Sequence, residues 1–160
     1  MDVQTLDLGF ILRKFPEFNF TMDEFDDRLR LQKFIYLMQS FDVYLGYDFS
    51  WYLRGPYCTR LTTCGFALDD GIYQRIPPDD GTSRFASETV QRRFNKFKEY
   101  IRGKATDATY LEIAASLHYL IKADGIDESV ALDMVYRKVP NTTREQCKSV
   151  LKELKELRLV

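Results

Sequence analysis

The chain has 160 residues, of which 45% are hydrophobic and 29% charged, and its net charge is −1. A chain of this length is typically one domain. Twelve Phe, ten Tyr and one Trp supply enough apolar surface for a core, which excludes a disordered chain. The near-neutral charge excludes a strongly basic nucleic-acid-binding protein, and no apolar run approaches the roughly 18 residues of a membrane span.

The beginning of the chain and its charge distribution bear on location and partners. The first residues are acidic and those that follow are basic, the reverse of a secretory signal, so we expect a cytoplasmic protein that binds no membrane. Residues 1–89 hold 9 Lys and Arg against 14 Asp and Glu, a net charge of −5, whereas residues 90–160 hold 14 against 10, or +4. Such an asymmetry either marks a half that faces a partner or is incidental to a solvated surface.

The N-terminal residues predict two helices. Residues 6–15 favour a short helix that ends before a proline. Thr21 and Glu24 have the spacing of a capping box, with Phe20 and Phe25 at the positions of a hydrophobic staple. A second helix is therefore expected to begin here and run to about residue 41. Its apolar residues cover most of the helix circumference, which is typical of a central helix that packs on several sides.

Residues 42–82 have a different character. Alternation over residues 49–53 predicts a strand, which Gly55 and Pro56 should end. We expect a short helix over 58–68 and a second short strand over 72–76. Residues 77–83, rich in Pro, Asp and Gly, are the best candidate for a linker.

Four further helices are expected over 86–102, 107–123, 128–138 and 143–158. Asp127 can cap the third, which should pack through Val130, Met134 and Val135. Thr142 and Glu145 offer a capping box for the last helix, whose apolar stripe is Cys147, Val150, Leu151, Leu154 and Leu157. The predicted fold class is mainly α with a small β element: a helical bundle that ends in a helix-turn-helix-like unit of three helices, with no evident wing.

Few residues suggest catalysis or metal binding. The cysteines, Cys58, Cys64 and Cys147, are odd in number and show no paired spacing, so we expect reduced thiols and no zinc site. The only histidine, His118, lies among apolar residues in a helix, where a core histidine with a hydrogen-bonded ring is the favoured interpretation. We expect no cofactor, no metal and no catalytic site.

Two sets of cations are candidates for binding double-stranded DNA or an acidic partner. One set is dense and interleaved with aromatic residues that match a core spacing. The other forms a stripe along the last helix, which would enter the major groove in a trihelical unit. The alternative for both is a solvated charged face. The residues are Arg92, Arg93 and Lys96 in the first set, and Arg144, Lys148, Lys152 and Lys155 in the second.

The segment 51–57 has the most distinctive local sequence. Aromatic residues beside a rigid Gly-Pro turn can form a patch that recognises a protein. Its candidate residues are Trp51, Tyr52, Arg54 and Tyr57. The alternative is that these aromatics fasten the segment onto the central helix.

Two segments carry a resemblance to known proteins. Leu31, Gln32 and Lys33 open an LQK-(apolar)-(apolar)-Tyr pattern, and Trp51 is followed by Gly55-Pro56. With the apolar pattern of residues 111–120 and 150–160, these features resemble the YwgA-like family of prokaryotic proteins and, more distantly, the Panacea/SocA-type antitoxin domain. The resemblance implies a mostly helical cytoplasmic protein without established enzymatic activity. For the distant relatives it implies an adaptor or antitoxin that contacts a partner protein.

We therefore expect one domain over 1–160, with a possible division into 1–82 and 83–160. The expected function is a non-catalytic interaction module, a regulator or antitoxin-like adaptor that binds a partner protein, DNA or both, and that can form a homodimer. Two alternatives stay open: a DNA-binding transcriptional regulator acting through residues 143–158, and an enzyme of unknown type.

Overall fold

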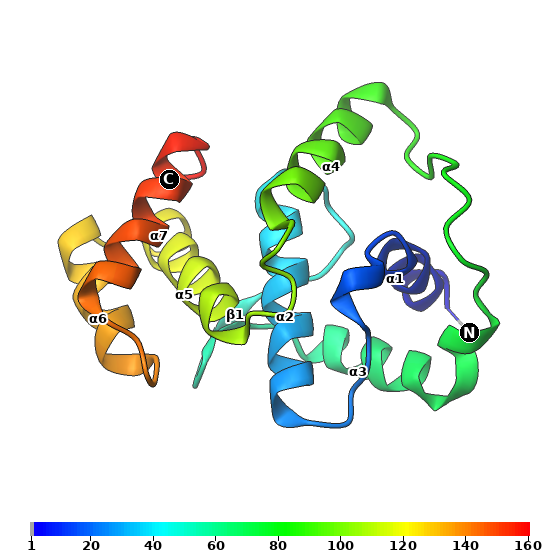
Figure 1. The fold of residues 1–160 in the computed structure, drawn as a ribbon, viewed down its shortest axis with the longest axis horizontal. Helices are drawn as coiled ribbons and strands as arrows, with labels where there is room; N and C mark the ends of the chain where they lie inside the picture. Colours follow the sequence, from blue (N-terminus) through cyan, green and yellow to red (C-terminus); the bar gives the residue numbers. More distant parts are fainter. Residues whose placement is uncertain (1) are drawn as a thin grey trace.

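The computed structural model describes residues 2–160, which fold as helices with one small two-stranded sheet (Figure 1). The α-helices are α1 (Val3–Arg13), α2 (Phe25–Ser40), α3 (Thr59–Ala67), α4 (Glu88–Ile101), α5 (Ala108–His118), α6 (Glu128–Lys138) and α7 (Arg144–Glu156). Shorter helical turns are η1 (Pro16–Phe18), η2 (Leu68–Ile72), η3 (Tyr73–Arg75) and η4 (Tyr119–Ala123), and the strands are β1 (Ser50–Tyr52) and β2 (Gly55–Tyr57). The prediction of a mainly α fold with a small β element is confirmed.

Helix α2 is the central element. Every residue from Leu29 to Met38 is buried, including the polar ones. Its Phe34 ring packs edge-on against Phe15 and Phe97, with centroids 4.9 and 5.2 Å apart. Because Phe15 follows α1 and Phe97 lies on α4, α2 joins both flanking helices in one core.

The start of α2 differs from the prediction. The N-cap is Glu24, which exchanges hydrogen bonds with Asp27 in a capping box, whereas the Thr21 hydroxyl accepts from the Asp23 backbone N–H in a local turn. Phe25 is 51% exposed, so it does not pack as a staple. The carboxylates of Glu24 and Asp27 satisfy the first amides of the helix, and the helix therefore begins after Glu24.

The second strand also lies elsewhere than predicted. β1 and β2 form an antiparallel hairpin in which Trp51 faces Pro56 and Tyr52 faces Gly55. Gly55 adopts φ +100°, which allows the chain to reverse within residues 53 and 54 instead of ending the sheet. Residues 72–76, expected to be a strand, belong mainly to the helical turns η2 and η3. Figure 1 shows the hairpin between α2 and α5.

Helices α5, α6 and α7 form the expected C-terminal trio, and Asp127 caps α6 by accepting from the Ser129 backbone N–H. The packing face of α6 differs from the prediction, however. Val130 and Met134 are exposed, while Ala131 and Val135 are buried. Val130 and Met134 lie four residues apart and so share one face of the helix. The face that packs against the neighbouring helices is the adjacent one, which carries Ala131 and Val135.

Helix α7 begins one residue later than predicted. Its N-cap is Thr143, whose hydroxyl accepts from the Gln146 backbone N–H at 3.1 Å. The Thr142 hydroxyl instead contacts the side-chain oxygen of Gln146. The apolar stripe from Cys147 to Leu154 is buried as expected, but Leu157 lies just beyond the helix and is exposed.

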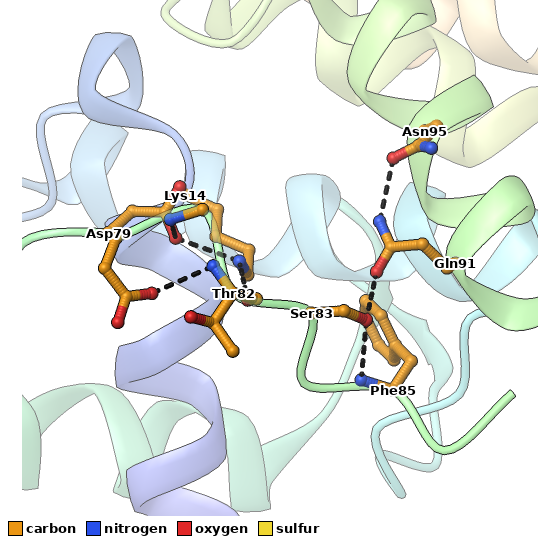
Figure 2. A network of polar contacts seen from close by, with 9 residues as sticks. Lys14, Asp79, Thr82, Ser83, Phe85, Gln91 and Asn95 are labelled. Atoms are coloured by element: carbon orange, nitrogen blue, oxygen red, sulfur yellow. Dashed lines mark hydrogen bonds and ion pairs between the residues drawn. The ribbon is translucent and has the colours of Figure 1, made fainter. Parts of the chain in front are cut away.

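The candidate linker is held in place by polar contacts (Figure 2). Lys14 Nζ donates to Asp79 Oδ1 and to the backbone oxygen of Thr82, both at 2.9 Å. Further along, the Ser83 hydroxyl donates to Gln91 of α4 at 2.6 Å. The segment is therefore bound by Lys14, at the C-terminal end of α1, and by Gln91 of α4.

Helix α4 packs with the N-terminal helices, although it follows the candidate linker. Phe94 contacts Phe15 with ring centroids 5.5 Å apart, and the C-terminal trio reaches this core mainly through α5 against α2. Within residues 2–160, no helix has both the length and the apolar character needed to cross a membrane.

Candidate partner-binding groove

A groove of about 460 Å³ lies between the hairpin, α2 and α3. Its wall is mostly apolar and contains three cations but no carboxylate. The lining residues are Phe25, Arg28, Leu29, Gln32, Lys33, Tyr52, Leu53, Arg54, Gly55, Tyr57, Thr62 and Phe66.

The groove gathers exposed apolar side chains. Of the large hydrophobic residues that are exposed within residues 2–160, four line this one groove: Phe25, Tyr52, Leu53 and Phe66. Phe25 comes from the first turn of α2, Phe66 from α3, and the other two from the hairpin. Convergence of apolar side chains from separate elements on one concavity is typical of a binding surface.

The hairpin presents its tyrosines to the groove. Tyr52 and Tyr57 lie on opposite strands with ring centroids 5.5 Å apart. The Tyr57 hydroxyl contacts Thr62 Oγ1 at 2.8 Å, which ties the hairpin to α3. The Arg54 guanidinium lies 5.3 Å from the centre of the Phe25 ring. These contacts link the aromatic wall of the groove to α2 and α3.

A buried lysine forms part of the groove wall. Lys33 is 1% exposed, and its Nζ donates to the Pro56 backbone oxygen at 2.7 Å. Burial is the main cause that lowers the pKa of Lys33 to about 7, and the cations of Lys138 and Arg54 lower it further, while the Glu112 carboxylate opposes them.

The buried carboxylate of Glu112, on α5, favours the charged form of Lys33. Both of its oxygens, however, are bound by other side chains. Arg54 donates to both oxygens, at 2.7 and 3.0 Å, and Lys138 Nζ lies 3.2 Å from one of them. Two parallel hydrogen bonds between a guanidinium and a carboxylate form a bidentate pair, which is stronger than a single neutral hydrogen bond. The cluster thus holds three basic side chains against one carboxylate.

Three of the four residues of the predicted patch line the groove, and the fourth lies outside it. Tyr52 and Tyr57 line the groove, and Arg54 both lines it and binds Glu112. Trp51 faces the other side of the hairpin, where its ring packs with Tyr119 and lies 5.1 Å from Lys138 Nζ. Trp51 fastens the hairpin to the C-terminal trio rather than to α2.

The cations predicted on α7 are exposed but mostly engaged in ion pairs. Arg144 pairs with Asp133 at 3.0 Å, and Lys155 with Glu128 at 2.9 Å. Lys148 lies 3.8 Å from Glu145, a weak surface pair. Lys152 has no ion-pair partner among residues 2–160.

The cations predicted on α4 are exposed and lie apart from the groove. Arg92, Arg93 and Lys96 form no ion pair within the described part of the chain. Arg93 and Lys96 line a separate open cleft of about 990 Å³ that also contains carboxylates of Glu99 and Glu156. The cleft therefore mixes charges of both signs.

His118 also lines this open cleft. Its Nδ1 and the Tyr36 hydroxyl share a hydrogen bond of 2.7 Å, and burial is the main cause that lowers the pKa of His118 to about 4. The ring is therefore neutral at pH 7. No carboxylate is a hydrogen-bond partner of this ring among residues 2–160, and the contact with Tyr36 joins α5 to α2.

The cysteines and other candidate ligands do not converge. Cys58, Cys64 and Cys147 are buried free thiols. Across residues 2–160, no group of three His, Cys, Asp or Glu side chains has an arrangement that could hold a metal ion.

Sequence reasoning missed Phe25 and Phe66 as groove residues, and Lys33 and Glu112 as a buried charged cluster. One signal was available. Lys33 directly precedes the apolar run of residues 34–38 in α2, and Glu112 stands between Leu111 and Ile113 at the start of α5. Charged residues inside apolar helical segments are rarely buried unless they have partners.

No family model, curated protein or solved structure gives a significant match to this chain. The resemblance to the YwgA-like family and to the Panacea/SocA-type antitoxin domain stays a prediction from the sequence.

Proposed function

We propose that this protein is a non-catalytic interaction module, an adaptor or antitoxin-like regulator that binds a segment of a partner protein in the groove between the hairpin, α2 and α3. The observation that carries the proposal is the gathering of Phe25, Tyr52, Leu53 and Phe66 around one apolar concavity. Aromatic anchors in a preformed pocket supply most of the binding free energy in many protein interfaces.

The charges of the groove specify the chemistry of the partner segment. Arg28, Lys33 and Arg54 line it, and no acidic side chain does. A complementary segment carries apolar side chains together with acidic ones, because opposite charges favour encounter and set the register of binding. A basic segment would meet like charge on the wall.

A selection from short random peptides tests the proposal. Peptides displayed on phage are selected on the full chain and then screened against Phe66→Asp, which places a charge in the groove at an exposed position. Tyr44→Asp is the matched control, because Tyr44 is an exposed aromatic outside the groove. We expect peptides that combine aromatic or aliphatic residues with Asp or Glu, and that bind Tyr44→Asp but not Phe66→Asp.

Two results would contradict this function. One is a selection without enriched peptides, or with peptides that bind Phe66→Asp as well as the native chain. The other is a concentration-dependent dimer, seen by sedimentation, that Phe66→Asp abolishes. The dimer would assign the groove to a second copy of this chain instead of a partner.

A further inference from the structure

The buried charges behind the groove do not balance. Both oxygens of Glu112 are bound by Arg54, and one also by Lys138. Among residues 2–160, the neutral Pro56 carbonyl is the one hydrogen-bond acceptor of Lys33, although an ammonium group carries three donors. A buried ammonium is costly unless it is paired, so an added carboxylate at Lys33 would offset part of the cost of its burial.

A second buried polar group lies against Gly55, the residue of the hairpin before Pro56. Ser116 Oγ is fully buried and has no hydrogen-bond partner among residues 2–160. A Cβ placed on Gly55 would lie 2.5 Å from Ser116 Oγ and 3.6 Å from Lys33 Nζ. Both side chains therefore pack closely against Gly55, and the space beside the Ser116 hydroxyl is too small for even a methyl group.

We propose that the inner end of the groove is a carboxylate site, in which Lys33, a residue of the groove wall, binds an acidic side chain of the partner segment. This inference deepens the proposed docking function and rests on it. The apolar wall around Lys33 excludes water, which strengthens the ion pair once the carboxylate has entered.

The size and charge of the site favour a carboxylate over a phosphate group. Arg54 is committed to Glu112, and Arg28 donates to the backbone oxygens of Met22 and Asp23, which leaves the single amine of Lys33. This amine matches one negative charge, whereas a phosphate group with about two charges is typically bound by several free cations or backbone amides.

A pair of small probes tests the site directly on the full chain. Hydrocinnamate and its neutral amide share an aromatic ring and differ only in the carboxylate. Their affinities are measured by NMR titration of the backbone amides of Gly55 and Tyr57. We expect the carboxylate to bind about tenfold more tightly than the amide, which is the range of one charge-assisted hydrogen bond.

Variants then assign the preference to Lys33. Lys33→Met keeps the length and apolar stem of the side chain and should abolish the preference for the carboxylate. Lys148→Met removes an exposed cation of α7 and should leave it unchanged. The comparison of the two probes on the native chain decides the matter even if Lys33→Met does not fold.

Equal affinity of the two probes, binding of neither, or a preference that persists in Lys33→Met would overturn the carboxylate site. These results are distinguishable from failure of the docking function. Selected peptides that depend on Phe66 but tolerate Asn or Gln in place of their acidic residues would leave docking intact and reject the site.

Discussion

At the scale of single residues, Lys33 is the most unusual group in the chain. A lysine on a central helix is normally excluded from the core because its ammonium loses hydration there. Here its stem packs in α2 while its Nζ reaches the hairpin at Pro56. Burial of the Lys33 ammonium lowers the free energy of unfolding, and equilibrium unfolding can measure that loss.

The pH dependence of stability should report that cost. The pKa of Lys33 is about 7 in the fold, against about 10.4 in an unfolded chain. Between these values the unfolded chain holds a proton that the folded chain has lost, so the free energy of unfolding rises with pH; below pH 7 the burial cost is present in full. Relative to Lys33→Met, the native chain should gain up to about 1.4 kcal/mol per pH unit above pH 7. Urea unfolding at neutral and alkaline pH measures this, and a constant difference between the two proteins would contradict it.

Glu112 is a second buried ionisable group, and it pairs with the half-buried cations of Arg54 and Lys138. Glu112→Gln leaves these partly solvated cations without a charged partner and should lower the free energy of unfolding by about 1–3 kcal/mol. Glu145→Gln removes a carboxylate with an 87% exposed side chain and should have no measurable effect. Similar losses in both variants, measured by urea unfolding, would show that the buried cluster does not stabilise the fold.

At the scale of elements, the hairpin depends on Gly55. Its φ of +100° is a region that side chains rarely adopt, and an added Cβ would meet Ser116 Oγ at 2.5 Å. Gly103 also has a positive φ, of +77°, but has open space around it. The two positions therefore separate backbone strain from steric overlap.

Alanine substitutions measure this difference. Gly103→Ala should cost about 1 kcal/mol from backbone strain alone. Gly55→Ala should cost at least about 1 kcal/mol more, because crowding adds to strain, and adding Ser116→Ala should recover part of the loss. Thermal unfolding of the single and double variants provides the measurement, and equal losses at Gly55 and Gly103 would argue against the close contact.

The start of α7 offers a second prediction at the element scale. Thr143 caps the helix through the Gln146 backbone N–H, while Thr142 makes only side-chain contacts. Thr143→Ala should therefore lower the free energy of unfolding by about 1 kcal/mol, and Thr142→Ala by clearly less. The reverse order in chemical denaturation would restore Thr142 as the cap that the sequence suggested.

At the scale of the whole molecule, the basic surfaces lie apart from the groove and differ from each other. The cations of α7 are mostly paired with carboxylates of α6 and α7, whereas Arg92, Arg93 and Lys96 on α4 are exposed without ion pairs among residues 2–160. A surface that alternates in charge has little field to attract a polyanion.

Binding to DNA through α7 is therefore expected to be weak. In a shift assay with duplex DNA at low salt, Lys148→Glu with Lys152→Glu should leave any complex unchanged, because most cations of α7 are already paired with carboxylates and few are free to displace counterions from phosphates. Retardation that falls with salt and disappears in Lys148→Glu with Lys152→Glu would instead assign DNA binding to α7. Loss only in Arg92→Glu with Arg93→Glu would assign it to α4.

Part of the groove was accessible from the sequence. Tyr52, Arg54 and Tyr57 were candidates because aromatic residues around a Gly-Pro pair are locally unusual. Phe25 and Phe66 were not, since each belongs to a helix whose apolar pattern predicts burial. Their exposure depends on where α2 begins and on how α3 lies against the hairpin.

By itself, the sequence determined the helical fold class, the central place of α2 and the C-terminal trio of helices. These follow from periodicity and caps, which act between residues a few positions apart. Tertiary structure alone decided the pairing of the α7 cations, the exposed face of α6, and the meeting of Lys33, Arg54, Glu112 and Lys138. The reason is that burial and ion pairing depend on contacts between elements distant in the chain, and a local pattern carries no information about which face a neighbour will cover.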